Sequence, residues 1–144
     1  MMVFGKKFSI KLLISSVLLG LTLCIAPINS HAARTTDCTT GVLQCRGVYL
    51  ERGDQAASTT SLYFSKGSVI TYGAKNNYST LGQFQVSVNL WRTSPLTKVA
   101  SQIVPFGGDK TFYFPVSESG NYAVVLQSGD SSQGRSYAFG WLKE

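Results

Sequence analysis

The 144-residue sequence contains very few of the side chains that usually carry enzyme chemistry. It has a single histidine, three cysteines and seven acidic residues. Histidine is the side chain that most often exchanges a proton near neutral pH, and zinc sites draw mainly on histidine and cysteine. The composition therefore argues against histidine-dependent catalysis and leaves little material for a metal centre.

The one histidine lies in an N-terminal segment with the features of a signal peptide. Three lysines flank the start of an apolar run over residues 12–26, Pro27 ends that run, and residues 30–32 give the small-x-small pattern that a signal peptidase requires. We therefore predict that residues 1–32 are cleaved and that residues 33–144 form a single secreted, extracellular domain.

Two other interpretations of this segment fit less well. The apolar run is about 15 residues long, whereas a helix that crosses a bilayer needs about 20. A lipoprotein needs a small residue before its modified cysteine, and Leu23 precedes Cys24. Cleavage after Ala32 removes His31 and Cys24, so Ser-His-Asp and Cys-His catalysis are excluded for the secreted domain.

The acidic residues do not form a recognisable catalytic or metal-binding pattern either. They fall mostly in predicted turns or near the chain ends, where a carboxyl serves as a turn residue: Asp37, Glu51, Asp54, Asp109, Glu118, Asp130 and Glu144. A glycosidase needs two carboxylates on either side of one sugar bond, and a calcium site needs several oxygen ligands. We predict no enzyme activity, no metal and no cofactor.

The predicted secreted domain is mildly positive. Removing the three signal-peptide lysines leaves ten basic and seven acidic residues, a net charge of +3. The basic residues are scattered singly along the chain, whereas a nucleic-acid-binding face needs a concentrated basic stripe. We therefore expect no nucleic acid as a partner, and a mild attraction to anionic cell-wall polymers or lipid surfaces.

Cys38 and Cys45 are the two thiols left after cleavage, and we predict a disulfide between them. Two nearby thiols in an oxidising compartment pair readily. Closing a loop of about eight residues contributes roughly 2.5 kcal/mol in the chain-entropy model. The spacing is not the Cys-x-x-Cys of redox proteins, and two thiols without histidine cannot complete a zinc site. The disulfide is therefore predicted to be a local structural clip.

The clearest secondary-structure signal is the alternation over residues 83–92. Apolar residues at the even positions from Phe84 to Leu90 alternate with polar ones, as in a strand with one buried face. In this register Trp91 points outward, on the same side as Asn89, unless a β-bulge intervenes.

Residues 110–117 repeat this pattern. The even positions from Phe112 to Val116 share one face of the strand, and Tyr113 and Pro115 share the other. Proline cannot donate a hydrogen bond to a neighbouring strand, so Pro115 indicates an edge strand or a bulged one.

The remaining segments complete an all-β prediction. A short turn over 117–120 leads to a further strand over 121–128, so we predict a hairpin; the run over 111–126 resembles a hairpin common in extracellular jelly-roll and accessory domains. Weaker signals favour strands over residues 46–52, 61–65, 68–73, 97–104 and 135–142. About eight short strands with Gly, Ser and Asn turns predict an antiparallel β-sandwich, jelly-roll-like or Ig-like.

Aromatic residues are the remaining candidates for a binding site. Most are expected in the core, such as Phe84, Phe112, Phe114, Tyr122 and Phe139. Trp91 and Tyr113 instead fall on the outward sides of their strands, unless a loop covers them. Outward rings can stack on sugars, and Asn89 and Arg92 lie near enough in sequence to assist. We predict these four residues as the binding residues.

The sequence therefore favours a secreted, non-catalytic binding or cell-surface module whose partner is a carbohydrate or cell-wall polymer. The alternative is a small secreted antimicrobial or membrane-active toxin, and membrane contact is expected only under that alternative. Arg52-Gly53-Asp54 matches the tripeptide that integrins recognise, but Gly-Asp after a strand is also what a turn uses. The sequence decides neither the role of that tripeptide nor the oligomeric state.

Overall fold

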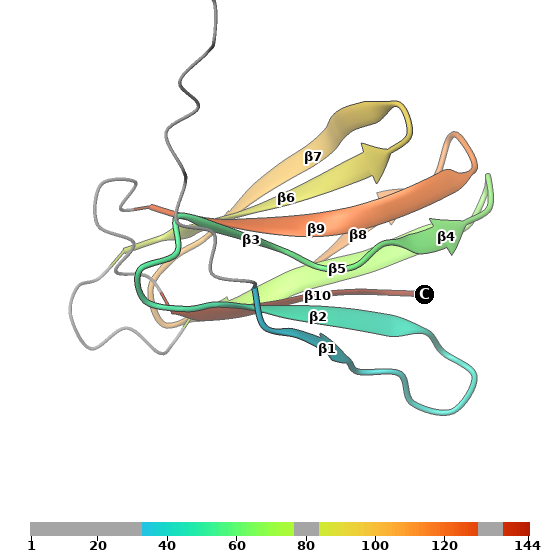
Figure 1. Ribbon diagram of the computed structural model, residues 1–144. Coiled ribbons are helices and arrows are strands. Elements are labelled where there is room, and N and C mark those ends of the chain that lie inside the picture. The colour runs from blue at the N-terminus through green and yellow to red at the C-terminus, as the bar shows by residue number, and fades with distance from the viewer. Residues whose placement is uncertain (1–32, 77–83, 130–136) are drawn as a thin grey trace, which may run out of the picture.

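A computed structural model describes residues 33–76, 84–129 and 137–144 (Figure 1), so the predicted signal peptide lies outside the described residues. Within those ranges the chain forms ten strands and no helix. The strands are β1 (Thr35–Asp37), β2 (Cys45–Leu50), β3 (Ala56–Ser58), β4 (Leu62–Phe64), β5 (Val69–Asn76), β6 (Val86–Thr93), β7 (Leu96–Val104), β8 (Gly108–Pro115), β9 (Gly120–Ser128) and β10 (Ala138–Lys143).

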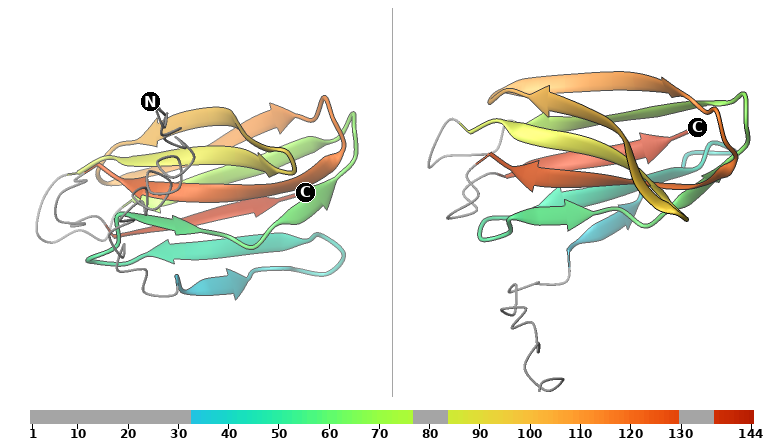
Figure 2. Two further views of the ribbon diagram at one scale, coloured as in Figure 1. Left: turned by 45° about the horizontal axis from the view of Figure 1, so that its top comes forward. Right: turned by 90° about the horizontal axis from the view of Figure 1, so that it is seen from above.

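The strands form two antiparallel sheets, which Figures 1 and 2 show stacked as two layers. The first sheet has the order β1-β2-β10-β5-β8, and the second has the order β3-β9-β6-β7, with β4 also paired to β9. The predicted antiparallel β-sandwich is confirmed. The strands β1 and β3 were not predicted, because each has three small or polar residues and no large apolar one, whereas β4, equally short, has Leu62 and Phe64 on its buried side. β8 lies at a sheet edge, as Pro115 indicated.

The core lies between the sheets and is built from the apolar sides of the strands. In β6, Val86, Val88 and Leu90 are fully buried, which confirms the alternation predicted there. Burying an aliphatic side chain of this size contributes about 1.5–3 kcal/mol. Tyr72 and Tyr122 are the largest buried side chains, and burial raises the pKa of both hydroxyls. Both therefore act as neutral core residues.

The predicted hairpin between residues 110–117 and 121–128 is wrong, because its two strands belong to different sheets. β8 pairs with β5, whereas β9 pairs with β6, β3 and β4. The link crosses one end of the sandwich, where the Tyr122 hydroxyl donates a 2.6 Å hydrogen bond to the Glu118 carbonyl. Even-numbered apolar residues of both strands face one core from opposite sides, half-buried in β8 and fully buried in β9. A four-residue link can join two strands of one hairpin or two strands in different sheets, so its length does not distinguish these arrangements.

The assignment of Phe139 to the core is also wrong. In β10 the core side is formed by Ala138, Gly140 and Leu142, and Phe139 lies on the outer side, half-buried. The reason is a close approach of β10 to β9: a Cβ at Gly140 would lie 2.7 Å from the Leu126 side chain. Only small residues fit inside at this point, so the large ring faces outward.

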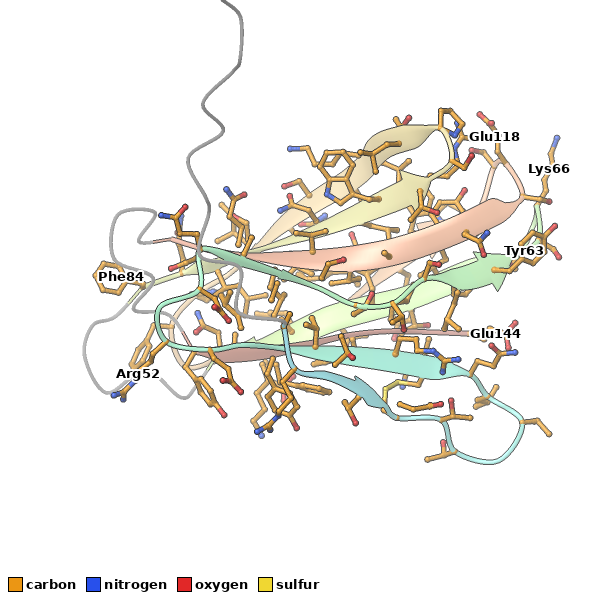
Figure 3. The ribbon with its side chains drawn as sticks, in the orientation of Figure 1. Arg52, Tyr63, Lys66, Phe84, Glu118 and Glu144 are labelled. Atoms are coloured by element: carbon orange, nitrogen blue, oxygen red, sulfur yellow. A yellow bond between two sulfur atoms is a disulfide. The ribbon has the colours of Figure 1, made fainter. Side chains whose placement is uncertain are left out.

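One end of the sandwich carries both Arg52 and Phe84 (Figure 3). Phe84 precedes β6 and is half-buried outside the core cluster, which corrects its assignment to the core. The Asp54 side chain is only 7% exposed, and its Oδ2 accepts a hydrogen bond from the Glu51 amide at 3.3 Å. Gly53 has a φ of +94°, which glycine tolerates in a turn. This geometry favours the turn interpretation of Arg52-Gly53-Asp54, because the carboxylate faces its own backbone.

Candidate functional site

The outer side of the first sheet carries a row of aromatic rings, which we name the Trp141 face and define by Tyr49, Phe139 and Trp141. Tyr49 on β2 lies directly opposite Phe139 on β10, with ring centroids 4.8 Å apart. Phe139 stacks with Trp141, with centroids 6.0 Å apart and ring planes inclined by 28°. All three side chains are half-buried. The three rings therefore form one continuous strip across two adjacent strands.

A glycine lies opposite Trp141 on each of the two strands that flank β10. Trp141 lies directly opposite Gly47 on β2 and Gly73 on β5. A Cβ at Gly73 would lie 2.8 Å from the Trp141 ring, and a Cβ at Gly47 would lie 2.6 Å from the Phe139 ring. The two rings therefore lie over bare backbone, which a side chain at position 47 or 73 would prevent.

A groove runs beside Trp141, between β10 and the loop that connects β1 to β2. The predicted disulfide between Cys38 and Cys45 is confirmed, and it closes this loop. The groove has a volume of about 320 Å³ and is lined by Cys38, Thr40, Leu43, Cys45, Phe139, Trp141 and Lys143. At the tip of the loop Val42 is 92% exposed. The groove thus has aromatic rings on one side and a covalently closed loop on the other.

The disulfide loop is held to the sheet by several polar contacts. The Cys45 amide donates a 3.1 Å hydrogen bond to Thr39 Oγ1, and the Thr39 amide donates a 2.9 Å hydrogen bond to Asp37 Oδ1. These contacts from Thr39, together with the Arg46 guanidinium 3.1 Å away, hold the pKa of the Asp37 carboxyl below its usual value. Within the loop, Thr40 and Leu43 form a β-bridge. The loop is thereby fixed in one conformation beside Trp141.

Cations surround the aromatic strip. The Arg34 guanidinium lies 3.9 Å from the centroid of the Tyr49 ring and 3.7 Å from Glu51. Lys75 on β5 lies directly opposite Phe139, and Lys143 lines the groove. Basic side chains thus lie beside each of the three rings.

Tyr113 lies on the same side of the same sheet, near its edge. It is 71% exposed, which confirms its predicted outward direction. Register pairs Tyr113 on β8 with Thr71 on β5, and Thr71 with Lys143 on β10. Tyr113 therefore shares the Trp141 face, with one strand between it and β10.

Trp91 lies on the opposite side of the molecule, on the outer side of the second sheet. It pairs with Ala123 on β9, and the register between β6 and β7 shifts after Leu90. Trp91 contributes to an apolar groove of about 280 Å³, lined by Ser58, Trp91, Thr93, Leu96, Ala123 and Val125. Leu96 and, farther along β7, Ile103 are strongly exposed. We name this surface the Trp91 face and define it by Trp91, Leu96 and Ile103.

The two polar residues predicted to assist Trp91 are engaged elsewhere. Asn89 is 5% exposed, and its Oδ1 accepts a 2.7 Å hydrogen bond from the Ser101 hydroxyl. The Arg92 guanidinium forms an ion pair with Glu118. The structure therefore does not bring the four predicted binding residues together: Trp91 and Tyr113 lie on opposite faces, and Asn89 and Arg92 are held within the protein.

The sequence analysis missed Tyr49, Phe139 and Trp141 as a surface group. A signal was present, because Phe139 and Trp141 alternate with the smaller Ala138, Gly140 and Leu142 along one strand. Large apolar residues normally face inward, so Phe139 was assigned to the core.

Metal-ligating clusters and membrane-spanning helices are both absent from the described residues. No group of three or more His, Cys, Asp or Glu side chains within them is placed to hold a metal ion. Nor do these ranges contain a helix with the length and hydrophobicity needed to cross a bilayer.

The chain matches no protein-family model and no curated protein sequence. Among solved structures it is similar to one described as "CBM4 structure and function", with a TM-score of 0.41 and 14% identity over 75% of this chain and 73% of the other. A second is described as "Family 16 Carbohydrate Binding Module-2", with a TM-score of 0.37 and 15% identity over 71% of this chain and 85% of the other. Structural similarity at this level does not indicate which ligand the chain binds. Only the side chains can indicate that.

Proposed function

We propose that this protein is a secreted, non-catalytic module that binds a carbohydrate polymer of a cell wall or extracellular matrix through its Trp141 face. The observation that carries the proposal is the placement of Trp141 between Gly47 and Gly73, which lets its ring lie over the sheet beside Phe139 with no side chain at either directly opposed position. A flat, accessible aromatic ring packs well against the C–H groups on one side of a sugar ring, and its edges remain near polar groups.

A polymer fits this face better than a single sugar. The rings of Tyr49, Phe139 and Trp141 follow one another at 4.8 and 6.0 Å, and Tyr113 continues the aromatic surface two strands away from Trp141. Several successive sugar units then find apolar contact on a surface that the sheet already holds in place. Such a surface needs little ordering on binding, which favours affinity.

The two tryptophans provide the test. We expect Trp141→Ala to weaken binding to isolated cell-wall polysaccharides about tenfold or more, about 1.4 kcal/mol, because it removes the central ring. Trp91→Ala is the matched control, since it removes the same side chain from the opposite face. Binding isotherms on insoluble polymer and circular dichroism of each variant supply the measurements. Unchanged binding by a folded Trp141→Ala protein contradicts the proposal, and a loss confined to Trp91→Ala would move the glycan site to the Trp91 face, where the sequence analysis predicted it.

A second candidate function has its own observation. Trp91, Leu96 and Ile103 expose apolar surface on one face, and the Lys98 ammonium lies 6.0 Å from the Trp91 ring centroid. Tryptophan beside exposed aliphatic groups and a cation is a combination found at lipid-water interfaces. This surface supports the membrane-active alternative, with the Trp91 face as the part that touches lipid.

Vesicles distinguish this second candidate from glycan binding. If lipid is the partner, Leu96→Ser with Ile103→Ser should abolish sedimentation with phosphatidylglycerol vesicles and the release of a trapped dye. Val42→Ser is the control, because it removes a still more exposed aliphatic side chain from the disulfide loop. Failure of the unaltered protein to bind or permeabilise vesicles would eliminate the membrane-active candidate.

A further inference from the structure

We propose that the groove between the disulfide loop and β10 binds an acidic sugar unit, with the Lys143 ammonium pairing with its carboxylate or sulfate. This inference rests on the proposed function and specifies the chemistry of the polymer: an acidic polysaccharide rather than a neutral one.

The groove has the size and walls of a ligand subsite. Its volume of about 320 Å³ lies at the lower end of the range for small-molecule sites, about 300–1,000 Å³. Phe139 and Trp141 supply aromatic surface, Leu43 supplies an aliphatic wall, and Thr40 supplies a hydroxyl. A sugar ring needs this combination, because one side of it is apolar and its rim is polar.

The lining of the groove carries positive charge only. Lys143 is the only charged residue among those that line it. Lys143 lies opposite Cys45 on β2 and Thr71 on β5, neither of which carries a compensating charge. The nearby carboxylate of Asp37 is paired with Arg46. Within the described residues Lys143 forms no ion pair, so its ammonium group is available to a ligand carboxylate in the groove.

Lys75 extends the positive surface along the same sheet. It lies opposite Phe139, and its position on β5 is four residues from Thr71, which pairs with Lys143. At about 3.3 Å per residue the two lysine positions are roughly 13 Å apart along the strands, with Trp141 between them. Asp109 lies opposite Lys75 on β8 and reduces its net attraction for an anion. Lys143 is accordingly the principal anion contact and Lys75 an auxiliary one.

The wall of the groove is fixed before any ligand arrives. The disulfide closes the base of the loop, the Thr40–Leu43 bridge closes its tip, and a 3.3 Å hydrogen bond from the Glu144 amide to the Gln44 carbonyl joins it to the end of β10. A loop that is already ordered loses little conformational entropy when it closes on a ligand. This rigidity favours selection for a unit of one shape and charge.

The main comparison is between two polymers with the same sugar backbone, one with free carboxylates and one with methyl-esterified carboxylates. Polygalacturonate and its fully methyl-esterified form share a sugar backbone, and hyaluronan and heparin add a second carboxylate source and a sulfate source. We expect the unaltered protein to bind at least one acidic polymer about tenfold more tightly than its neutral counterpart at low salt, with the preference falling as salt rises. Lys143→Gln should remove that preference, and Lys143→Arg should largely retain it.

Lys66→Gln is the matched control. It removes the same charge from the turn between β4 and β5, which lies at the same end of the sandwich as Glu144 (Figure 3) but does not line the groove. Equal binding of charged and neutral polymers, or a preference that survives Lys143→Gln, overturns this inference. Binding to neutral glycans alone overturns it too but leaves the proposed function standing. Binding to none of these polymers and to no isolated cell-wall fraction removes both.

Discussion

The two outer faces of the sandwich each present a tryptophan, but the strands around those tryptophans differ. Trp141 is flanked by glycines and lies over bare backbone, beside a groove with a single positive charge. Trp91 is flanked by Ala123 and lies in an apolar groove with Leu96 and Val125. The difference shows that exposure of a tryptophan says little by itself. The residues beside a tryptophan decide whether its ring lies flat on the sheet or packs into a groove of aliphatic side chains.

The largest effect is expected from filling the space beside Trp141. Gly73→Ala places a Cβ 2.1 Å from the Lys110 carbonyl oxygen and 2.8 Å from the Trp141 ring, so the backbone or the ring has to move. We expect a loss of about 3 kcal/mol in the free energy of unfolding, within the range for overpacked sites. Urea denaturation measures it.

Gly120→Ala is the matched control for Gly73→Ala. Gly120 also lies in a strand, but its added Cβ meets nothing nearer than Arg92 at 3.6 Å. We expect a change within about 1 kcal/mol there. If both variants lose the same stability, the close contact at Gly73 is not what distinguishes the Trp141 face.

The disulfide loop should give the next largest effect. Replacing Cys38 and Cys45 with serine removes the covalent closure and should cost up to about 2.5 kcal/mol in the free energy of unfolding. Glycan binding should weaken as well, because the loop forms one wall of the groove beside Trp141. Vesicle binding through the Trp91 face should not change, and a parallel fall in both activities would show that the double variant is damaged throughout.

Fluorescence can separate the two faces, because each tryptophan lies on a different face. The chain has two tryptophans, so Trp91→Phe and Trp141→Phe each leave a single reporter. Adding the bound polysaccharide should shift or quench the emission of Trp141 in the Trp91→Phe protein and leave the emission of Trp91 nearly unchanged in the other. The opposite result would assign the ligand to the Trp91 face.

The smallest effect is expected from acid. Hydrogen bonds from Thr39 and the Arg46 charge hold the pKa of Asp37 below its ordinary value of 3.8, so folding favours the ionised carboxylate. That contribution is complete well above pH 3.8 and is lost as the pH falls through the lowered pKa. Thermal unfolding between pH 6 and pH 2 should show a slightly steeper fall for the unaltered protein than for Asp37→Asn. Superimposable curves would show that this carboxylate does not help to fix the loop.

More of the fold than of the binding site could be predicted from the sequence. Alternation in β6 and β8 gave the buried residues, the outward direction of Trp91 and Tyr113, and the edge position of β8, because period-two burial is a local property. The pairing of β8 with β5 was not predictable from the local pattern, since both a hairpin and a crossover bury the same residues. The spacing of Cys38 and Cys45 correctly predicted the disulfide.

The aromatic strip could not be predicted from the sequence, because it depends on a long-range contact. Phe139 and Trp141 face outward because β10 approaches β9 so closely that Gly140 alone fits against Leu126. Nothing near Gly140 in the sequence reveals that approach. The same limit applies to Asn89, whose alternation places it on the outer side but whose hydrogen bond to Ser101 depends on the register between β6 and β7.

The central position of β10 in its sheet has a consequence for assembly. β10 follows every other described strand in the chain, yet it lies between β2 and β5 and joins the pair β1-β2 to the pair β5-β8. We expect pairings this distant in sequence to form late in folding, because long loops have to close first. Trp141 reaches its position over Gly47 and Gly73 only when β10 has inserted. The sheet and its aromatic surface are therefore completed in the same step, and a chain that has not finished folding presents no strip for a ligand.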